Sequence, residues 1–273
     1  MTITNHDHGS HVDSACCTPE QSLQEDAFAS NLDSYCSVPT DRDASSAALD
    51  DIVEASATSP EVEALRSAGF RLLLDGGQPV HLDRWAAAAG VDGETLNEII
   101  ETSGAKGRVQ FDADGSLVGI AGLTVEPTRH ELNIDGTIRW TWCALDAVGI
   151  LGALAATGTI RSTDPQTNAA VKVDFVQGEP NSGATLFILG GYDGGNVVED
   201  WCPLVNFFAT RRDAEVWVAA EGLEGDIVSA SSVATQAAEM WRPVVNNPTP
   251  EVHRNDESTM VQQRVEGKVP HGH

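Results

Sequence analysis

The chain has 273 residues, enough for one large domain or two small ones with tails, and its apolar share of 41% is sufficient for a core. A formal net charge of −25, from 41 acidic against 16 basic residues, argues against nucleic-acid or anionic-membrane binding, because both need a positive face. No apolar run approaches the ~20 residues of a membrane helix, and the first residues lack the features of a signal peptide. We therefore expect a cytoplasmic protein, and its acidity and scarcity of lysine predict adaptation to high salt (a halophilic protein).

Two segments at the ends of the chain, residues 1–58 and 246–273, are predicted to be disordered. The first holds eleven acidic residues, a single arginine and few large apolar side chains, so burial cannot offset the entropy of ordering it. It also carries the thiols of Cys16 and Cys17 after three histidines, His6, His8 and His11. One interpretation is a solvated acidic extension; the other is an arm that captures a soft metal and passes it on.

Residues 59–128 are predicted to form a winged-helix-like module. Ser59 and Pro60 mark a helix start, followed by acidic residues that suit the positive end of the helix dipole. Two more short helices and a β-hairpin follow; the expected segments are helices at 64–74, 81–90 and 94–100, then strands at 108–111 and 117–120. The third helix is acidic and would repel phosphates, so we expect this module not to bind DNA.

Residues 129–245 are predicted to form a second domain with a mainly antiparallel sheet flanked by helices, which makes the fold class α+β. A hairpin at 131–140 leads into an almost entirely apolar helix that begins near Cys143, and such a helix should be deeply buried. Cys202 is placed in a short helix. The other expected segments are strands at 159–162, 171–176, 184–189 and 205–209, and helices at 213–221 and 231–241, the last one ended by Pro243.

Three side chains of this second domain are candidates for chemistry. Cys143 and Asp146 are three residues apart, so on a helix they lie on one face. Cys143 is expected in the first helical turn, where the dipole favours a thiolate. An acid on an apolar helix is costly to bury without a partner or purpose, so Asp146 should have a raised pKa and could deliver a proton. Cys202 would supply a second thiol, although either cysteine alone could be a small buried hydrophobe.

The segment Trp-Cys-Ala-Leu-Asp at 142–146 resembles the catalytic segment of the organomercurial (alkylmercury) lyases, the MerB family. The same is true of Trp-Cys at 201–202 with Val-Asn-Phe-Phe-Ala at 205–209, and of the glycine-rich segment 221–229. The resemblance covers roughly residues 60–245 and includes the first module, which in that family does not bind DNA. The chain departs from the family at Pro203, where a further cysteine is common, and at 162–168, where a structural cysteine is common.

The resemblance implies protonolytic cleavage of a carbon–mercury bond, giving a hydrocarbon and Hg(II), in mercury resistance and detoxification. Mercury is soft and prefers thiolate sulfur, so Cys143 and Cys202 would hold it while Asp146 moves the proton to carbon. Which cysteine attacks first stays open. No cofactor is implied; free low-molecular-weight thiols or a mercuric reductase would take the Hg(II), and Cys16 and Cys17 could assist its capture.

Two other functions are compatible with parts of the sequence. The helical module could belong to a metal-responsive winged-helix transcription regulator, which the acidic third helix disfavours. The thiols could belong to a mercury-binding protein without turnover, which the presence of Asp146 disfavours.

Overall fold

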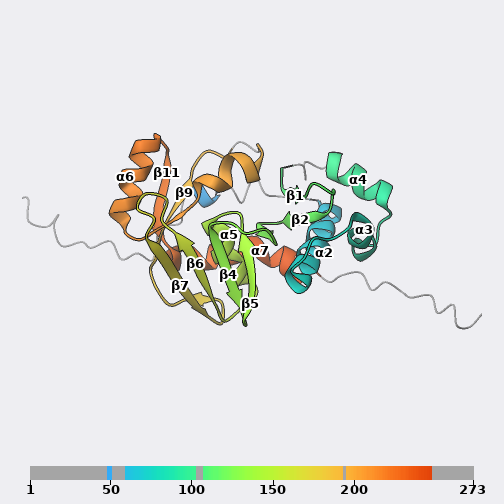
Figure 1. Cartoon of the computed structure of the whole chain (residues 1–273), viewed down its shortest axis with the longest axis horizontal. Coiled ribbons are helices and arrows are strands. Elements are labelled where there is room, and N and C mark those ends of the chain that lie inside the picture. The colour runs from blue at the N-terminus through green and yellow to red at the C-terminus, as the bar shows by residue number, and fades with distance from the viewer. Residues whose placement is uncertain (1–47, 51–58, 103–106, 193–194, 248–273) are drawn as a thin grey trace, which may run out of the picture. The chain divides into compact units, whose positions relative to one another are not determined.

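The computed structural model describes residues 48–50, 59–102, 107–192 and 195–247, and Figure 1 shows their arrangement. Most residues of the predicted disordered segments, with Cys16 and Cys17, lie outside the described residues. The prediction of disorder is wrong at residues 48–50, which are helical with Ala48 and Leu49 buried in the core, because these apolar side chains find partners in the rest of the fold. Among the described residues, none of the helices combines the length and apolar character needed to cross a membrane.

In the described part of the chain, three helices with complete bounds follow the helical residues 48–50 and precede the first strand. Helix α2 begins as predicted, with the Ser59 hydroxyl accepting a hydrogen bond from the Val62 backbone and Pro60 at the first position, and Gly77 ends it with a left-handed φ of 62°. Its apolar stripe buries Leu65, Phe70 and others against the core. The helices are α2 (Pro60–Gly76), α3 (Leu82–Ala89) and α4 (Gly93–Thr102).

An antiparallel sheet of eight strands forms the main layer, in the order β1-β2-β3-β5-β4-β6-β7-β8. The predicted hairpin of the first module is present as the first two strands, but β3 joins it to the strands of the second module. The winged-helix assignment and the boundary at residue 128 stay predictions. The strands are β1 (Val109–Phe111), β2 (Leu117–Ile120), β3 (Leu123–Thr124), β4 (His130–Ile134), β5 (Thr137–Thr141), β6 (Gly158–Thr163), β7 (Ala170–Val176) and β8 (Glu179–Pro180).

A second, three-stranded antiparallel sheet has the order β10-β9-β11 and carries helix α6. Its strands are β9 (Thr185–Leu189), β10 (Phe207–Phe208) and β11 (Gly225–Ser229), and α6 spans Arg211–Glu221. The predicted strand at 205–209 is thus only two residues long. The α+β class with a mainly antiparallel sheet flanked by helices is confirmed.

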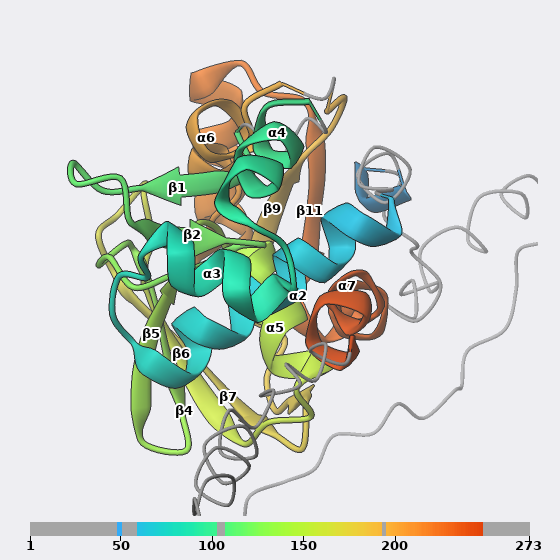
Figure 2. The ribbon, with the colours of Figure 1, turned by 90° about the vertical axis from the view of Figure 1, so that its right-hand side faces the viewer.

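Helix α5 (Ala144–Ala153) lies at the centre of the core, and helix α7 (Ala230–Asn246) packs along it. Figure 2 shows α7 beside α5 and α2. Two glycines allow this close approach, because a Cβ at Gly149 would lie 2.1 Å from the Trp241 ring and one at Gly152 would lie 2.8 Å from the Ala238 methyl. Apolar residues surround α5 on nearly every side, as its sequence predicts.

The predicted end of the last helix before Pro243 is wrong, because α7 continues to Asn246 through the proline. A proline inside a helix removes one hydrogen bond and usually breaks the helix. Here the Arg71 guanidinium donates to the carbonyls of Val245 and Asn247, both at 2.9 Å, and so fixes the last turn from α2. Tertiary contacts thereby override the local signal.

Candidate active site

Cys143 and Asp146 are joined by a reciprocal capping arrangement at the start of α5. Cys143 is the N-cap residue: its Sγ accepts a hydrogen bond from the Asp146 backbone N–H at 3.4 Å. In return the Cys143 backbone N–H donates to Asp146 Oδ2 at 2.9 Å. This is a capping box in which sulfur takes the usual place of a hydroxyl. The pairing predicted from their spacing is therefore present, although Cys143 lies just before the helix and not in its first turn.

Cys202 reaches the same point from a distant part of the chain. It follows η1 (Val197–Trp201), which the Asn196 side chain caps, and it begins the short helix η2 (Cys202–Leu204). The Ala144 backbone N–H donates to the Val205 carbonyl at 3.0 Å, so this segment is fastened directly to the start of α5. Cys202 Sγ lies 3.8 Å from Asp146 Oδ2. One ligand atom from each of Cys143, Asp146 and Cys202 lies within 4.8 Å of the other two.

Burial raises the pKa of Asp146 to about 6, although hydrogen bonds from both cysteines and the positive charge of Arg66 oppose this shift. The side chain is almost entirely inaccessible, with 5% of the residue exposed. The predicted rise is confirmed. Near neutral pH this carboxyl group can therefore both accept and return a proton.

The two thiols differ in their ease of ionisation. Burial raises the pKa of Cys143 well above its usual range, and the neighbouring Cys202 and Asp146 raise it further. The expectation that the helix dipole would favour a Cys143 thiolate is therefore wrong, because desolvation outweighs it. A hydrogen bond from Cys143 lowers the pKa of Cys202, but burial and the charge of Asp146 outweigh it, so that pKa is also raised. The positive charge of Arg108 acts to lower the pKa of Cys202, so it would stabilise a Cys202 thiolate.

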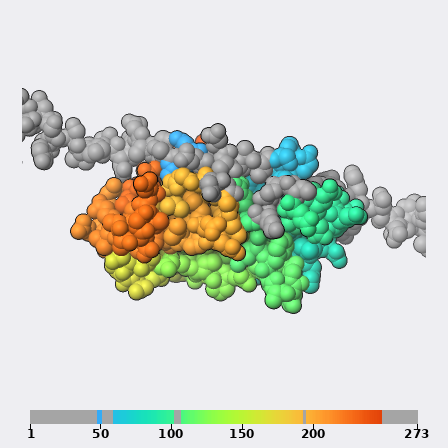
Figure 3. All heavy atoms as spheres, turned by 90° about the horizontal axis from the view of Figure 1, so that it is seen from above, coloured from blue at the N-terminus to red at the C-terminus, as the bar shows by residue number. Residues whose placement is uncertain are grey.

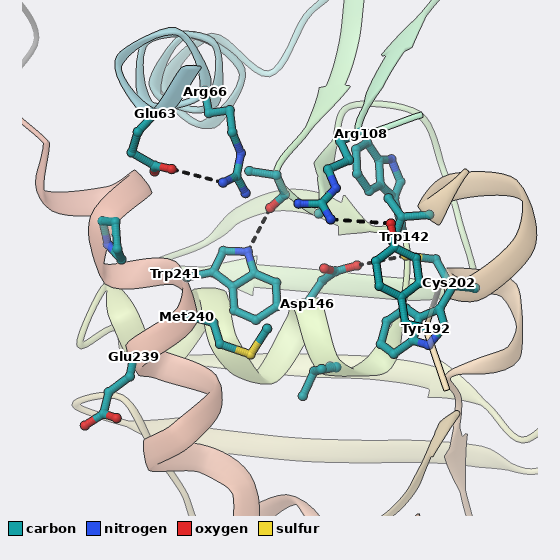
Figure 4. Close-up of a pocket in the computed structure, with 16 residues that line it drawn as sticks. Glu63, Arg66, Arg108, Trp142, Asp146, Tyr192, Cys202, Glu239, Met240 and Trp241 are labelled. Atoms are coloured by element: carbon teal, nitrogen blue, oxygen red, sulfur yellow. Dashed lines mark hydrogen bonds and ion pairs between the residues drawn. The ribbon is translucent and has the colours of Figure 1, made fainter. Parts of the chain in front are cut away.

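A cavity of about 360 Å³ opens onto this group. Cys202 and Asp146 are on its wall, whereas Cys143 lies behind them and is fully buried. Figure 4 shows Asp146 and Cys202 between the aromatic side chains of Trp142, Tyr192 and Trp241. In the space-filling view the segment that carries η1 (light orange) adjoins the green segment that leads into β1 (Figure 3). The Val198 backbone N–H donates to the Gly107 carbonyl at 3.4 Å across this junction.

A tight turn between β2 and β3 presses against Asp146. Ala121 and Gly122 both have left-handed backbones, with φ of 52° and 84°. A Cβ at Gly122 would lie 2.2 Å from Asp146 Oδ1, so only glycine leaves room for the carboxylate. The Trp241 indole of α7 donates to the Ala121 carbonyl at 2.8 Å, and the Trp142 backbone N–H donates to the Gly122 carbonyl at 3.0 Å. These bonds fix the turn from two sides.

The structure brings together all three side chains singled out in the second domain, while Cys16 and Cys17 lie outside the described residues. Sequence reasoning missed the cavity residues that come from elsewhere in the chain, namely Arg66, Arg108, Gly122, Tyr192 and Trp241. The scarcity of basic residues could have drawn attention to the two arginines. No local sequence pattern identifies Gly122, Tyr192 or Trp241 as cavity residues.

Comparisons with known proteins point to one family. The model of the family MerB, described as alkylmercury lyase, matches residues 123–242. The alkylmercury lyase of Bacillus cereus is 27% identical over 151 residues, which cover 54% of this chain and 67% of that protein. The alkylmercury lyase of Streptomyces lividans is 29% identical over 176 residues, covering 63% and 78%. The crystal structure of the mercury-bound form of MerB2 has the same fold, with 19% identity, a TM-score of 0.62, and coverage of 72% of this chain and 97% of that chain.

Proposed function

Since the chain belongs to the alkylmercury lyase family, we propose that it cleaves the carbon–mercury bond of organomercurials by protonolysis at Cys143, Asp146 and Cys202. The observation that carries this proposal is the buried cluster of two thiols and one carboxyl group at the wall of a cavity. The products would be a hydrocarbon and Hg(II), as required for mercury resistance.

Cys202 would bind the substrate first, because Cys202 lines the cavity and Cys143 does not. The Cys202 thiol passes its proton to the ligand that the organomercurial carries, commonly a thiolate, which leaves as a free thiol while the Cys202 sulfur forms the first sulfur–mercury bond. Mercury is soft, so this exchange of one thiolate for another at mercury is favourable where oxygen or nitrogen ligands would not compete. The displaced ligand leaves through the cavity.

Cys143 would then supply the second sulfur. Its thiol is protonated at neutral pH, so it must lose a proton as it binds mercury, and Asp146 is the adjacent acceptor. The second thiolate increases the electron density on the mercury-bound carbon. Asp146 returns the proton to that carbon, the electron pair of the carbon–mercury bond becomes the new carbon–hydrogen bond, and Hg(II) stays between the two sulfurs. Low-molecular-weight thiols or a mercuric reductase would then remove the ion by thiolate exchange.

The buried and partly aromatic surroundings of the cluster favour this sequence of steps. Trp142, Trp201 and Trp241 line the cavity around the carboxyl group and limit access of water. Interactions between the proton, the carboxylate and the thiolates are stronger in such an environment than in water.

The proposal is tested by measuring, with gas chromatography, the benzene released from phenylmercury. We expect turnover by the natural chain and loss of at least about 100-fold in kcat in Asp146→Asn, in line with general acid–base catalysis. The Asn variant keeps an oxygen that can accept from the Cys143 N–H, so its fold is preserved. Near-normal turnover in this variant, or mercury binding by the natural chain with no benzene, would contradict the assignment.

A further inference from the structure

Four large aromatic side chains line the cavity that exposes Cys202 and Asp146. The chain has only six tryptophans and two tyrosines, so four of these eight residues are gathered at one small cavity. In the proposed mechanism the organic group of the substrate lies among them, because its mercury-bound carbon has to reach Asp146 (Figure 4). The four are Trp142, Tyr192, Trp201 and Trp241.

Three of these aromatic side chains are fixed by hydrogen bonds to the backbone. Each donates to the carbonyl oxygen of another residue: Trp241 to Ala121 at 2.8 Å, Trp201 to Leu189 at 3.1 Å and Tyr192 to Gly195 at 3.0 Å. A backbone carbonyl group is kept when the side chain at its position is replaced. Trp142 differs, because its indole N–H donates at 3.0 Å to a side chain, the Oε1 atom of Gln110. The orientation of the Trp142 ring therefore depends on a side chain that one substitution removes.

Gln110 is itself held in the orientation that presents its oxygen to Trp142. Its Nε2 donates to Glu126 Oε2 at 3.0 Å. An indole N–H can only donate and a carboxylate can only accept, so these two contacts determine which end of the amide faces each partner. The Thr124 hydroxyl lies 3.4 Å from the same Oε1 atom. The amide of Gln110 thus connects Glu126 of one segment to the Trp142 ring of another.

The contact between Gln110 and Trp142 is possible because Gly119 has no side chain. Gly119 pairs with Gln110 across β1 and β2 and with Thr124 across β2 and β3, so the three residues form one cross-strand row. A Cβ at Gly119 would lie 2.9 Å from both Gln110 Oε1 and Trp142 Nε1. The backbone of Gly119 is not left-handed. The close approach of the two side chains, and not the backbone, therefore requires glycine here.

We propose that Gln110 is a specificity-determining residue: by holding the Trp142 ring in place, it makes the cavity prefer organomercurials whose organic group is an aromatic ring. This inference rests on the proposed function and specifies its substrate class. Two rings attract each other beyond the effect of buried area when they are offset-stacked or edge to face, and a fixed ring provides that geometry. A methyl group makes no such contact. Gln110 is not among the described residues that line the cavity, so it acts through Trp142 as a positioning residue.

The test compares phenylmercury with methylmercury, each in excess 2-mercaptoethanol, through the benzene and methane that are released. The measured quantity is the ratio of the two kcat/KM values, phenylmercury over methylmercury, in which effects common to both substrates cancel. Gln110→Leu keeps most of the side-chain volume but removes the acceptor. We expect it to lower the ratio about fivefold, mainly through the KM of phenylmercury, as loss of one well-oriented aromatic contact implies. Gly119→Ala disturbs the same contact by a different route and should also lower the ratio.

Exchange of the two polar residues distinguishes positioning of the ring from general damage to the fold. In the double variant Gln110→Glu with Glu126→Gln, position 110 again accepts from the indole and position 126 donates to it, so the ratio should return to that of the natural chain. The indole N–H signal of Trp142 gives a direct measurement, by NMR of protein with ¹⁵N-labelled tryptophan and with Trp142→Phe for assignment. This signal should move in Gln110→Leu and recover in the double variant.

Gln166→Leu is the matched control. Gln166 is an exposed residue of the loop between β6 and β7, so the same replacement there leaves the cavity intact. Its ratio should equal that of the natural chain. Thermal unfolding followed by circular dichroism checks that the variants fold. If Gln110→Leu does not fold, the comparison is made with Gly119→Ala.

Two kinds of result would overturn this inference alone. One is an unchanged ratio, with activity on phenylmercury and methylmercury either kept or reduced equally. The other is a lower ratio in Gln110→Leu while the indole signal of Trp142 stays where it is in the natural chain. Failure of the natural chain to release hydrocarbon from either substrate would overturn the proposed function and this inference with it.

Discussion

The carboxyl group of Asp146 and the backbone of Cys143 hold each other in place: Asp146 Oδ2 accepts from the Cys143 N–H at 2.9 Å, and the Asp146 N–H donates to Cys143 Sγ at 3.4 Å. The same Oδ2 atom lies 3.8 Å from Cys202 Sγ. One oxygen thus accepts from the Cys143 backbone and faces the Cys202 thiol. In the proposed mechanism, a proton would pass from a thiol to this carboxyl group and then to the mercury-bound carbon.

The first prediction concerns the order of attack. Cys202 lines the cavity and Cys143 is fully buried behind it, so Cys143→Ser should still form a covalent adduct with phenylmercury, whereas Cys202→Ser should form it much more slowly. Mass spectrometry of briefly exposed protein gives the adduct fraction for each variant. Equal adduct formation in both variants would contradict the assignment of capture to Cys202.

The second prediction is that the buried carboxyl group of Asp146 reduces the stability of the fold at neutral pH. The folded pKa of Asp146, about 6, is above its ordinary value of 3.8, so the native state binds this proton more tightly than the unfolded state does. Its contribution to stability is full below pH 3.8 and is lost as the pH rises through about 6, which amounts to roughly 3 kcal/mol. Urea unfolding should show Asp146→Asn gaining stability relative to the natural chain across this interval. If the unfolding free energies of the natural chain and Asp146→Asn changed in parallel with pH, the idea of a buried, proton-binding carboxyl group would be contradicted.

The third prediction compares two glycine-to-alanine variants, of which both strain the backbone but only one displaces the carboxyl group of Asp146. Gly122 and Gly136 have φ of 84° and 85°, so alanine at either position costs about 1 kcal/mol of backbone strain. At Gly136 the new methyl group would meet nothing within 4 Å, but at Gly122 it would lie 2.2 Å from Asp146 Oδ1. We expect Gly122→Ala to lower kcat at least about tenfold, because the methyl group would displace the carboxyl group that is proposed to move the proton. Gly136→Ala should leave kcat unchanged. Similar kcat values in the two variants would show that the turn does not position Asp146.

The fourth prediction concerns stability in acid. His130 is buried with its Nδ1 2.9 Å from the Ser162 hydroxyl, and burial, aided by the charge of Arg129, lowers its pKa to about 3. The unfolded chain therefore binds this proton first, and stability falls as the pH drops below 6.5, by about 2 kcal/mol at pH 5. His130→Gln should remove this loss, seen as a smaller difference between the unfolding free energies at pH 7 and pH 5. An unchanged difference would mean that other groups control the acid transition.

Local patterns predicted most of the elements of the fold. Helices α2 to α5, the hairpins of β1 with β2 and β4 with β5, and the strands β6, β7 and β9 are near their predicted positions, because capping residues, glycines and alternating apolar residues act over a few neighbours. The two-residue strands β3 and β8 and the strand β11 were not predicted. Their pairing depends on distant partners, such as Ile188 for Asp226 in β11.

The sequence by itself determined that Cys143 and Asp146 would meet, since the contact of an N-cap residue with the third helical residue is local. It also determined that Asp146 would be buried, because the helix that carries it is apolar all round. Only the tertiary structure decided that Cys202, 56 residues after Asp146, lies beside them, and that Arg66 and Arg108 line the same cavity. It likewise decided the ionisation of Cys143, since the helix end favours a thiolate but desolvation depends on everything packed around the sulfur, and desolvation is the stronger effect.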